Sequence, residues 1–159
     1  MPSSSAIVVG TDGSPTAGAV VRRAARLAHI TGGLVHVVSA YKTLAGTGRA
    51  PFAPSFAAER ADAEEILREA ADYVRSEQAD VKTHAVPGDP ADALIAVAET
   101  EDAGMIVVGD VGMSGRRRYL MGSVPDKISH HAPCNVLILR TAGDPSAPRR
   151  RMGEEGGSQ

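Results

Sequence analysis

Met105-Ile106-Val107-Val108-Gly109-Asp110-Val111-Gly112 decides the fold, because a continuous apolar run ends there in two closely spaced glycines. After nine more residues, Gly122-Ser123 opens a segment with helical spacing, 124–131. Glycines let backbone N–H groups approach a phosphate, and the first turn of a helix adds unpaired donors and a partial positive charge. The spacing therefore predicts an anion-binding loop between a strand and a helix.

Outward from this stretch, the chain alternates between apolar runs and segments with a helical period. Strands are predicted at 6–10, 34–40, 81–86, 105–109 and 135–140, and helices at 15–31, 57–76, 90–103 and 124–131. Ser14-Pro15 and Asp89-Pro90 each place a capping side chain before a proline at the first helical position. Gly32-Gly33 ends the first helix. Residues 41–55 show no period and predict a long loop.

The strand pattern predicts an α/β protein with an open parallel sheet. Four of the runs, 6–10, 34–40, 105–109 and 135–140, are almost continuously apolar. Such runs are typical of strands covered on both faces by helices, which is the arrangement of parallel sheets. The run at 81–86 alternates with polar residues and predicts a position near an edge.

Composition bounds the class of protein. A chain of 159 residues with 43% apolar and 23% charged residues is typical of one soluble domain. Its net charge of −2 and lack of tryptophan disfavour nucleic-acid binding. The single cysteine, Cys134, excludes an intrachain disulfide and is consistent with a reducing cytoplasm. No signal peptide or membrane-spanning run is predicted. Residues 143–159 lack apolar residues to bury, so a domain over 1–142 and a disordered tail are expected.

Two loops are predicted at the carboxyl ends of strands, Thr11–Ser14 and 109–123. Open parallel sheets bind ligands at such ends, where the strand order reverses. If the strands 6–10 and 105–109 are neighbours, both loops face one crevice. There Asp12 could accept a hydrogen bond from a ligand or cap its own turn. Ser123 could bind a phosphate or, with Asp126, merely cap its helix.

Several better-known signatures are missing. The sequence has no G-x-x-x-x-G-K-[ST], no G-x-G-x-x-G after the first strand and no G-x-S-x-G. No catalytic relay follows from the histidines. Cys134 is interpreted as a packed thiol rather than as a metal ligand with His130 and His131, and His36 as a core or interface histidine. Asp110 would repel a polyphosphate, although the arginines at 116–118 could offset its charge.

These motifs together resemble the universal stress protein family in its small single-domain form, over about Ala6–Thr141. The resemblance rests on the Gly-x2-Gly-x9-Gly-Ser pattern and on the stretches Ile7–Ser14, Val35–Val38, Val107–Gly109, Gly122–Val124 and His131–Ile138. It implies a Rossmann-like fold of the adenine nucleotide alpha hydrolase type. The implied sheet has five parallel strands in the order 3-2-1-4-5, with helices on both faces. The glycine pattern marks the family's ATP-binding branch.

The resemblance also implies a ligand and the residues that hold it. Asp12 and the backbone of Val37 would lie near the adenine and ribose. Gly109 and Gly112 would line the ribose and phosphates, and Gly122-Ser123-Val124 would hold the phosphate chain. The predicted site comprises Gly10, Thr11, Asp12, Val37, Gly109, Asp110, Gly112, Gly122, Ser123 and Val124. ATP and cyclic AMP both stay open as ligands, because a cyclic monophosphate suffers less repulsion from Asp110. A divalent cation could join Asp12 and Asp110.

The expected role is a cytoplasmic stress-response protein that senses or sequesters an adenine nucleotide and forms a homodimer through the strand at 135–140. No catalytic residue is predicted, and neither a nucleic acid nor a membrane is an expected partner. Two alternatives stay open. One is a slow ATPase or autophosphorylating protein, and the other is a dimeric interaction protein whose crevice is empty.

Overall fold

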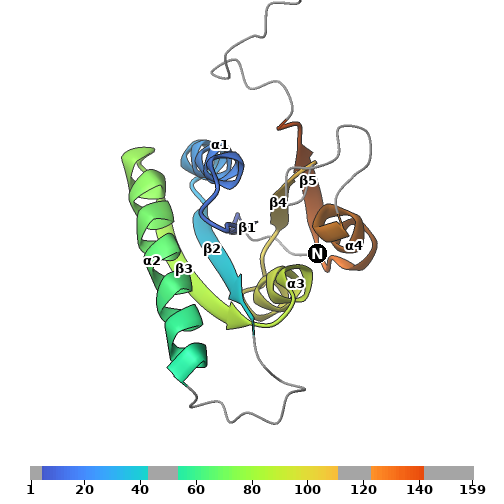
Figure 1. The fold of residues 1–159 in the computed structure, drawn as a ribbon. Coiled ribbons are helices and arrows are strands. Elements are labelled where there is room, and N and C mark those ends of the chain that lie inside the picture. The colour runs from blue at the N-terminus through green and yellow to red at the C-terminus, as the bar shows by residue number, and fades with distance from the viewer. Residues whose placement is uncertain (1–4, 43–53, 111–122, 142–159) are drawn as a thin grey trace, which may run out of the picture.

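The structure is a computed structural model that describes residues 5–42, 54–110 and 123–141, with the side chains of 54–58 left aside. Strands and helices alternate along the chain (Figure 1). In order they are β1 (Ile7–Gly10), α1 (Pro15–Thr31), β2 (Leu34–Tyr41), α2 (Pro54–Ser76), β3 (Asp80–Pro87), α3 (Pro90–Thr100), β4 (Met105–Gly109), α4 (Ser123–His131) and β5 (Asn135–Leu139).

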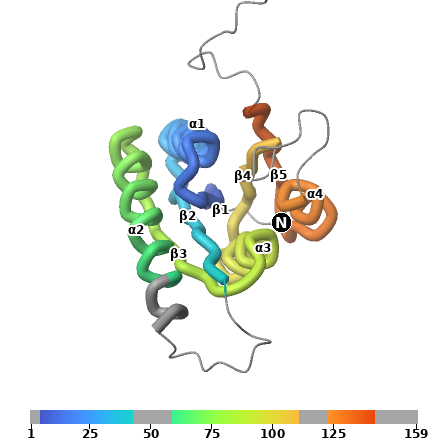
Figure 2. The backbone as a smooth tube through the Cα atoms, in the orientation of Figure 1, coloured from blue at the N-terminus to red at the C-terminus, as the bar shows by residue number. Residues whose placement is uncertain are grey.

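The described strands form one five-stranded parallel sheet in the order β3-β2-β1-β4-β5. This confirms the predicted fold class and strand order. The chain starts at the centre of the sheet, runs out through β2 to β3, and then crosses back to β4 and β5 (Figure 2). The direction of travel reverses between β1 and β4, so the two strands leave a crevice beyond their carboxyl ends.

Two hydrophobic clusters hold helices against the two faces of the sheet (Figure 1). One joins α1 and α2 to side chains such as Val9 and Val37. The other joins α3 and α4 to the opposite side chains, such as Val8 and Ile106. Neighbouring positions on β1 thus face opposite clusters, which is why β1 reads as a continuous apolar run.

Three predicted helix ends are confirmed, whereas the helix predicted over 90–103 ends at Thr100. Ser14 Oγ accepts a hydrogen bond from Ala17 N at 3.2 Å, and Asp89 Oδ2 accepts one from Asp92 N at 3.1 Å. Each cap precedes a proline at the start of its helix. Gly32 adopts a φ of 68°, a left-handed conformation that glycine tolerates, and so ends α1.

Some expectations need correction. The helix expected from residue 57 begins at Pro54, so it takes the last residues of the predicted loop. The strand 135–140 lies at the edge of the sheet, as the predicted order requires, but it is less covered than its apolar composition predicts. Leu137 and Ile138 are 36% and 38% exposed there. An edge strand has a neighbour on one side alone, so apolar composition does not by itself guarantee cover. The predicted tail at 143–159 lies outside the described residues.

None of the helices in the described ranges combines the length and the apolar composition needed to cross a membrane.

Candidate functional site

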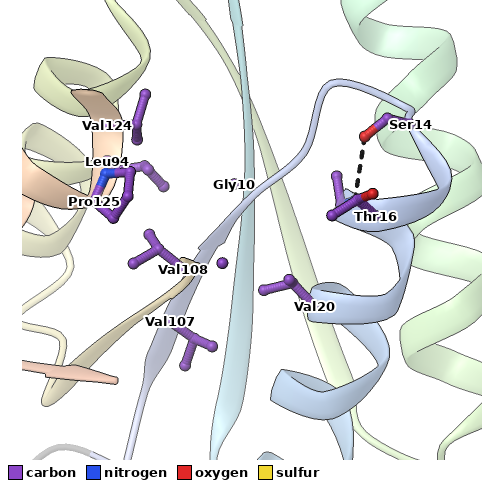
Figure 3. A pocket seen from close by; sticks show the side chains of 11 residues that line it. Gly10, Ser14, Thr16, Val20, Leu94, Val107, Val108, Val124 and Pro125 are labelled. Atoms are coloured by element: carbon purple, nitrogen blue, oxygen red, sulfur yellow. Dashed lines mark hydrogen bonds between the residues drawn. The ribbon is translucent and has the colours of Figure 1, made fainter. Parts of the chain in front are cut away.

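A pocket of about 440 Å³, counting the space open to solvent, lies at the carboxyl ends of β1 and β4. We call it the β1–β4 pocket. Figure 3 shows it between the start of α1 on one side and Leu94, Val124 and Pro125 on the other. The described residues that line it are Gly10, Ser14, Thr16, Ala17, Val20, Leu94, Val107, Val108, Gly109, Val124 and Pro125. Most of these side chains are apolar, so the walls suit a flat or aliphatic group.

Gly10 closes β1 directly beside Leu94. A Cβ atom at Gly10 would lie 3.2 Å from Leu94 Cδ1 and 3.3 Å from Cδ2. Leu94 is fully buried in the cluster under α3, so any larger side chain at position 10 would press on a wall of the pocket. The absence of a side chain at Gly10 therefore keeps this wall in place.

Two helices begin at the β1–β4 pocket. α1 contributes Ser14, Thr16 and Ala17 from its first turn, and α4 contributes Val124 and Pro125 from its own. The N-terminal end of a helix carries partial positive charge and N–H groups without helical partners. Two such ends at one pocket make it favourable for an anion.

The turn after β1 is held by its own side chains. Thr11 is buried; its backbone N donates to Val38 O at 2.9 Å and its Oγ1 accepts from Gly13 N at 3.1 Å. Asp12 is exposed, and its Oδ1 accepts from Ser14 N at 2.9 Å. The local capping role considered for Asp12 is thus present, and it leaves a carboxylate at the mouth of the crevice.

A second hollow of about 870 Å³, also counting open space, adjoins the first at Ser14. It runs between α1 and α2, from the Thr11 turn to Arg22 and Tyr73. The Arg22 guanidinium lies 4.5 Å from the centre of the Tyr73 ring, a cation–π contact. Space therefore opens on both sides of Ser14, just beyond the end of β1.

Asp110 follows β4 and is turned toward the end of β5. Its Oδ1 accepts hydrogen bonds from Thr141 N at 2.9 Å and from Thr141 Oγ1 at 2.7 Å. Its backbone N donates to Leu139 O at 2.8 Å. The carboxylate is thus fixed beside the strand end, one residue from the pocket wall at Gly109.

The structure brings part of the predicted site together. Gly10, Gly109 and Val124 line the β1–β4 pocket, and Ser123 is the exposed first residue of α4 beside it. Thr11 and Asp12 lie in the adjoining turn. Gly112 and Gly122 lie outside the described residues.

Val37 is the predicted site residue that lies deepest in the fold. It sits in the strand beside β1, paired with Val9, and its side chain is fully buried under α1 and α2. Only its backbone could meet a ligand, which is the role the resemblance implies for it.

Eight of the eleven described wall residues do not belong to the predicted site. They are Ser14, Thr16, Ala17, Val20, Leu94, Val107, Val108 and Pro125. Leu94 carries the helical spacing of a core residue, and nothing in the sequence distinguishes it as a pocket wall. Pro125 lies inside a predicted helix and carries no such signal either.

Cys134 behaves as the packed thiol that was expected. It is half-buried against the cluster under α3 and α4, and this burial raises the pKa of its thiol. His130 instead faces Asp126, with 3.7 Å between Nε2 and Oδ1.

Known proteins resemble this chain over nearly its whole length. The model of the universal stress protein family matches residues 4–140. Universal stress protein Rv1636 of Mycobacterium tuberculosis strain H37Rv is 35% identical over 151 residues, which cover 85% of this chain and 95% of the relative.

Two solved structures combine this likeness with a bound nucleotide. A universal stress protein in complex with cAMP is 33% identical, with a TM-score of 0.69, over 86% of this chain and 97% of that one. The universal stress protein of Archaeoglobus fulgidus in complex with dAMP is 30% identical, with a TM-score of 0.65, over 87% and 98%. With the strand order and these matches in agreement, the chain belongs to the universal stress protein family.

Proposed function

We propose that this universal stress protein binds an adenine nucleotide with a single phosphate, cyclic AMP before ATP, in the β1–β4 pocket. The observation that carries the proposal is the convergence of two helix starts and two glycine-ended strands on one pocket. The apolar walls suit the adenine and ribose, and the helix starts suit the phosphate. Relatives that are 33% and 30% identical bind cAMP and dAMP, which supports this ligand class.

Charge favours one phosphate over three. The described wall residues of the pocket include no lysine or arginine, so the helix starts are the described source of positive potential. Asp110 adds a negative charge next to the wall. A cyclic monophosphate carries one negative charge and a triphosphate several, so the triphosphate meets more repulsion.

We further propose that the protein acts by binding rather than by turnover, as a cytoplasmic sensor or store of the nucleotide. The single cysteine supports the cytoplasmic location. Asp12 Oδ1 and Asp110 Oδ1 already accept hydrogen bonds from nearby groups. Cyclic AMP binding is therefore expected to be the same in Mg²⁺ and in EDTA. Phosphate release from ATP above the buffer rate, lost in a Ser123→Ala variant, would instead favour the ATPase alternative.

Isothermal titration of the full chain with cyclic AMP and with ATP tests the binding proposal. We expect saturable binding of both, tighter for cyclic AMP, at one site per chain. Gly10→Ala should weaken cyclic AMP binding about tenfold, or about 1.4 kcal/mol, because the added methyl group crowds Leu94 at the pocket wall.

Gly18→Ala is the matched control. It replaces a glycine within α1 that does not line the β1–β4 pocket, and the nearest atom to its new Cβ is Tyr73 Cε2 at 3.9 Å. This variant should keep its affinity and gain about 0.5–1 kcal/mol of stability from better helix propensity. A folded wild-type chain that gives no heat with either nucleotide would overturn the proposal. Equal affinity in Gly10→Ala and wild type would place the nucleotide elsewhere.

A further inference from the structure

A polar cluster lies inside the fold, away from the residues that line the β1–β4 pocket. It consists of His36 on β2, His84 on β3 and Glu101 just after α3. His36 is 1% exposed and is among the largest fully buried side chains of the described residues. His84 and Glu101 are half-buried, so the cluster reaches solvent on their side.

The strand register brings the two histidines together. His36 pairs with Lys82 and Val38 pairs with His84, so the histidines are diagonal neighbours on one face of the sheet. Val38 belongs to the cluster under α3 and α4, which identifies this face as the one that α3 covers. The end of α3 then places Glu101 over the histidine pair.

The three side chains are spaced as an incipient metal site. His36 Nδ1 and His84 Nε2 share a hydrogen bond at 2.9 Å, so one of the two nitrogens carries a proton that a bound ion would replace. One ligand atom from each of the three residues lies within 4.8 Å of the others. Zinc bonds of about 2.0–2.2 Å in a tetrahedron separate the ligand atoms by roughly 3.3 Å. The two nitrogens need to part by a few tenths of an ångström to reach that separation.

The electrostatic surroundings suit a cation. Burial lowers the pKa of His36 and of His84, and Lys82 lowers both further, so the imidazoles are neutral ligands at neutral pH. Glu101 opposes this shift and contributes a negative charge. The carboxyl end of α3 adds partial negative charge next to it. The Lys82 ammonium works against a cation, and its charge is outweighed once the carboxylate becomes a ligand.

We propose that His36, His84 and Glu101 bind one divalent transition-metal ion of the zinc class through Nδ1, Nε2 and a carboxylate oxygen. Two imidazoles and one carboxylate form a donor set that zinc uses in proteins, with the fourth position left to water. The same set binds Co²⁺, which has an observable spectrum, and it disfavours Mg²⁺, which prefers oxygen ligands. The site links two strands and a helix end, so the ion stabilises that side of the fold. It does not depend on nucleotide binding.

The test is a titration of the full, metal-stripped chain with Co²⁺, followed by visible absorption, and then displacement by Zn²⁺. We expect one Co²⁺ per chain with the d–d bands of a low-coordinate site, bleached by Zn²⁺ and untouched by Mg²⁺. Glu101→Gln keeps the shape of the side chain and removes its charge. This variant should bind Co²⁺ at least about 10–100-fold more weakly, because the loss of a mere outer-shell partner already costs that much metal affinity. His84→Ala should do the same.

His131→Ala is the matched control, because it removes an exposed histidine far along the chain at the end of α4. It should bind Co²⁺ like wild type. Circular dichroism of each variant shows whether it is folded. The proposal is overturned if the folded wild type takes up no Co²⁺ at micromolar concentration. It is equally overturned if Glu101→Gln and His84→Ala bind as wild type does, or if His131→Ala abolishes the bands.

Discussion

At position 110, one carboxylate oxygen accepts both the backbone N–H and the hydroxyl of Thr141. The negative charge is thereby fixed near the pocket wall instead of swinging freely in solvent. A fixed charge discriminates among ligands more sharply than a mobile one, since the ligand's arrival cannot push it aside. We therefore expect Asp110 to make the protein discriminate between nucleotides by the charge of their phosphates.

Asp110→Asn tests this at the residue scale. The amide keeps an oxygen to accept from Thr141, so the geometry is retained while the charge is removed. We expect ATP affinity to rise roughly three- to tenfold relative to cyclic AMP affinity, because the triphosphate experiences the lost repulsion more strongly. Titration calorimetry with both ligands measures the ratio. A ratio that stays at the wild-type value in low salt would show that Asp110 does not select the ligand.

Among the elements, β5 is an edge strand with exposed apolar side chains. It lies at an edge of the sheet and presents Leu137 and Ile138 at 36% and 38% exposure. Edge strands with exposed apolar side chains tend to pair with another chain. We propose that two copies of the protein pair through β5.

Ile138→Arg should convert the dimer into a monomer, because it places a charge in an apolar contact. Light scattering after gel filtration measures the mass in solution. Ile30→Arg is the matched control: Ile30 is 79% exposed on α1, and its replacement should leave the mass unchanged. If Ile138→Arg has the same mass as wild type, β5 is not the interface.

The elements were predictable because each carries its own local signal. Ser14-Pro15, Asp89-Pro90 and Gly32 predicted helix ends that the structure confirms. The apolar runs predicted the strands, and the family resemblance supplied their order. Local signals do not predict contacts between side chains of elements that lie far apart in the sequence. Leu94 meets Gly10 only because α3 packs beside β1, and His36 meets His84 only through the register of β2 and β3.

Acid should lower the stability of the folded protein through the pair of His36 and His84. Burial lowers the pKa of both histidines in the folded state, with Lys82 adding to the effect and Glu101 opposing it. The unfolded chain then takes up protons first, below about pH 6.5. The free energy of unfolding should fall between pH 7.5 and 5.5, with a slope of up to about 1.4 kcal/mol per pH unit for each histidine.

Urea unfolding in EDTA across that range measures the slope without metal. His84→Gln should flatten it, because one of the shifted groups is gone. His131→Gln changes an exposed histidine and should keep the wild-type slope. If the free energy of unfolding falls with the same slope in His84→Gln and in wild type, His36 and His84 do not govern stability in acid.

The central position of β1 has a consequence for how the protein is made. Residues up to Pro87 contain β1, β2 and β3, which are contiguous in the sheet, together with α1 and α2, which cover one face. A nascent chain emerging from the ribosome can therefore assemble this part while one side of β1 is still unpaired. The β1–β4 pocket is completed only when the later residues of β4 and α4 arrive. The protein thus gains its binding site only after α4 has been made, and a ligand present during synthesis cannot stabilise the earlier intermediates through this pocket.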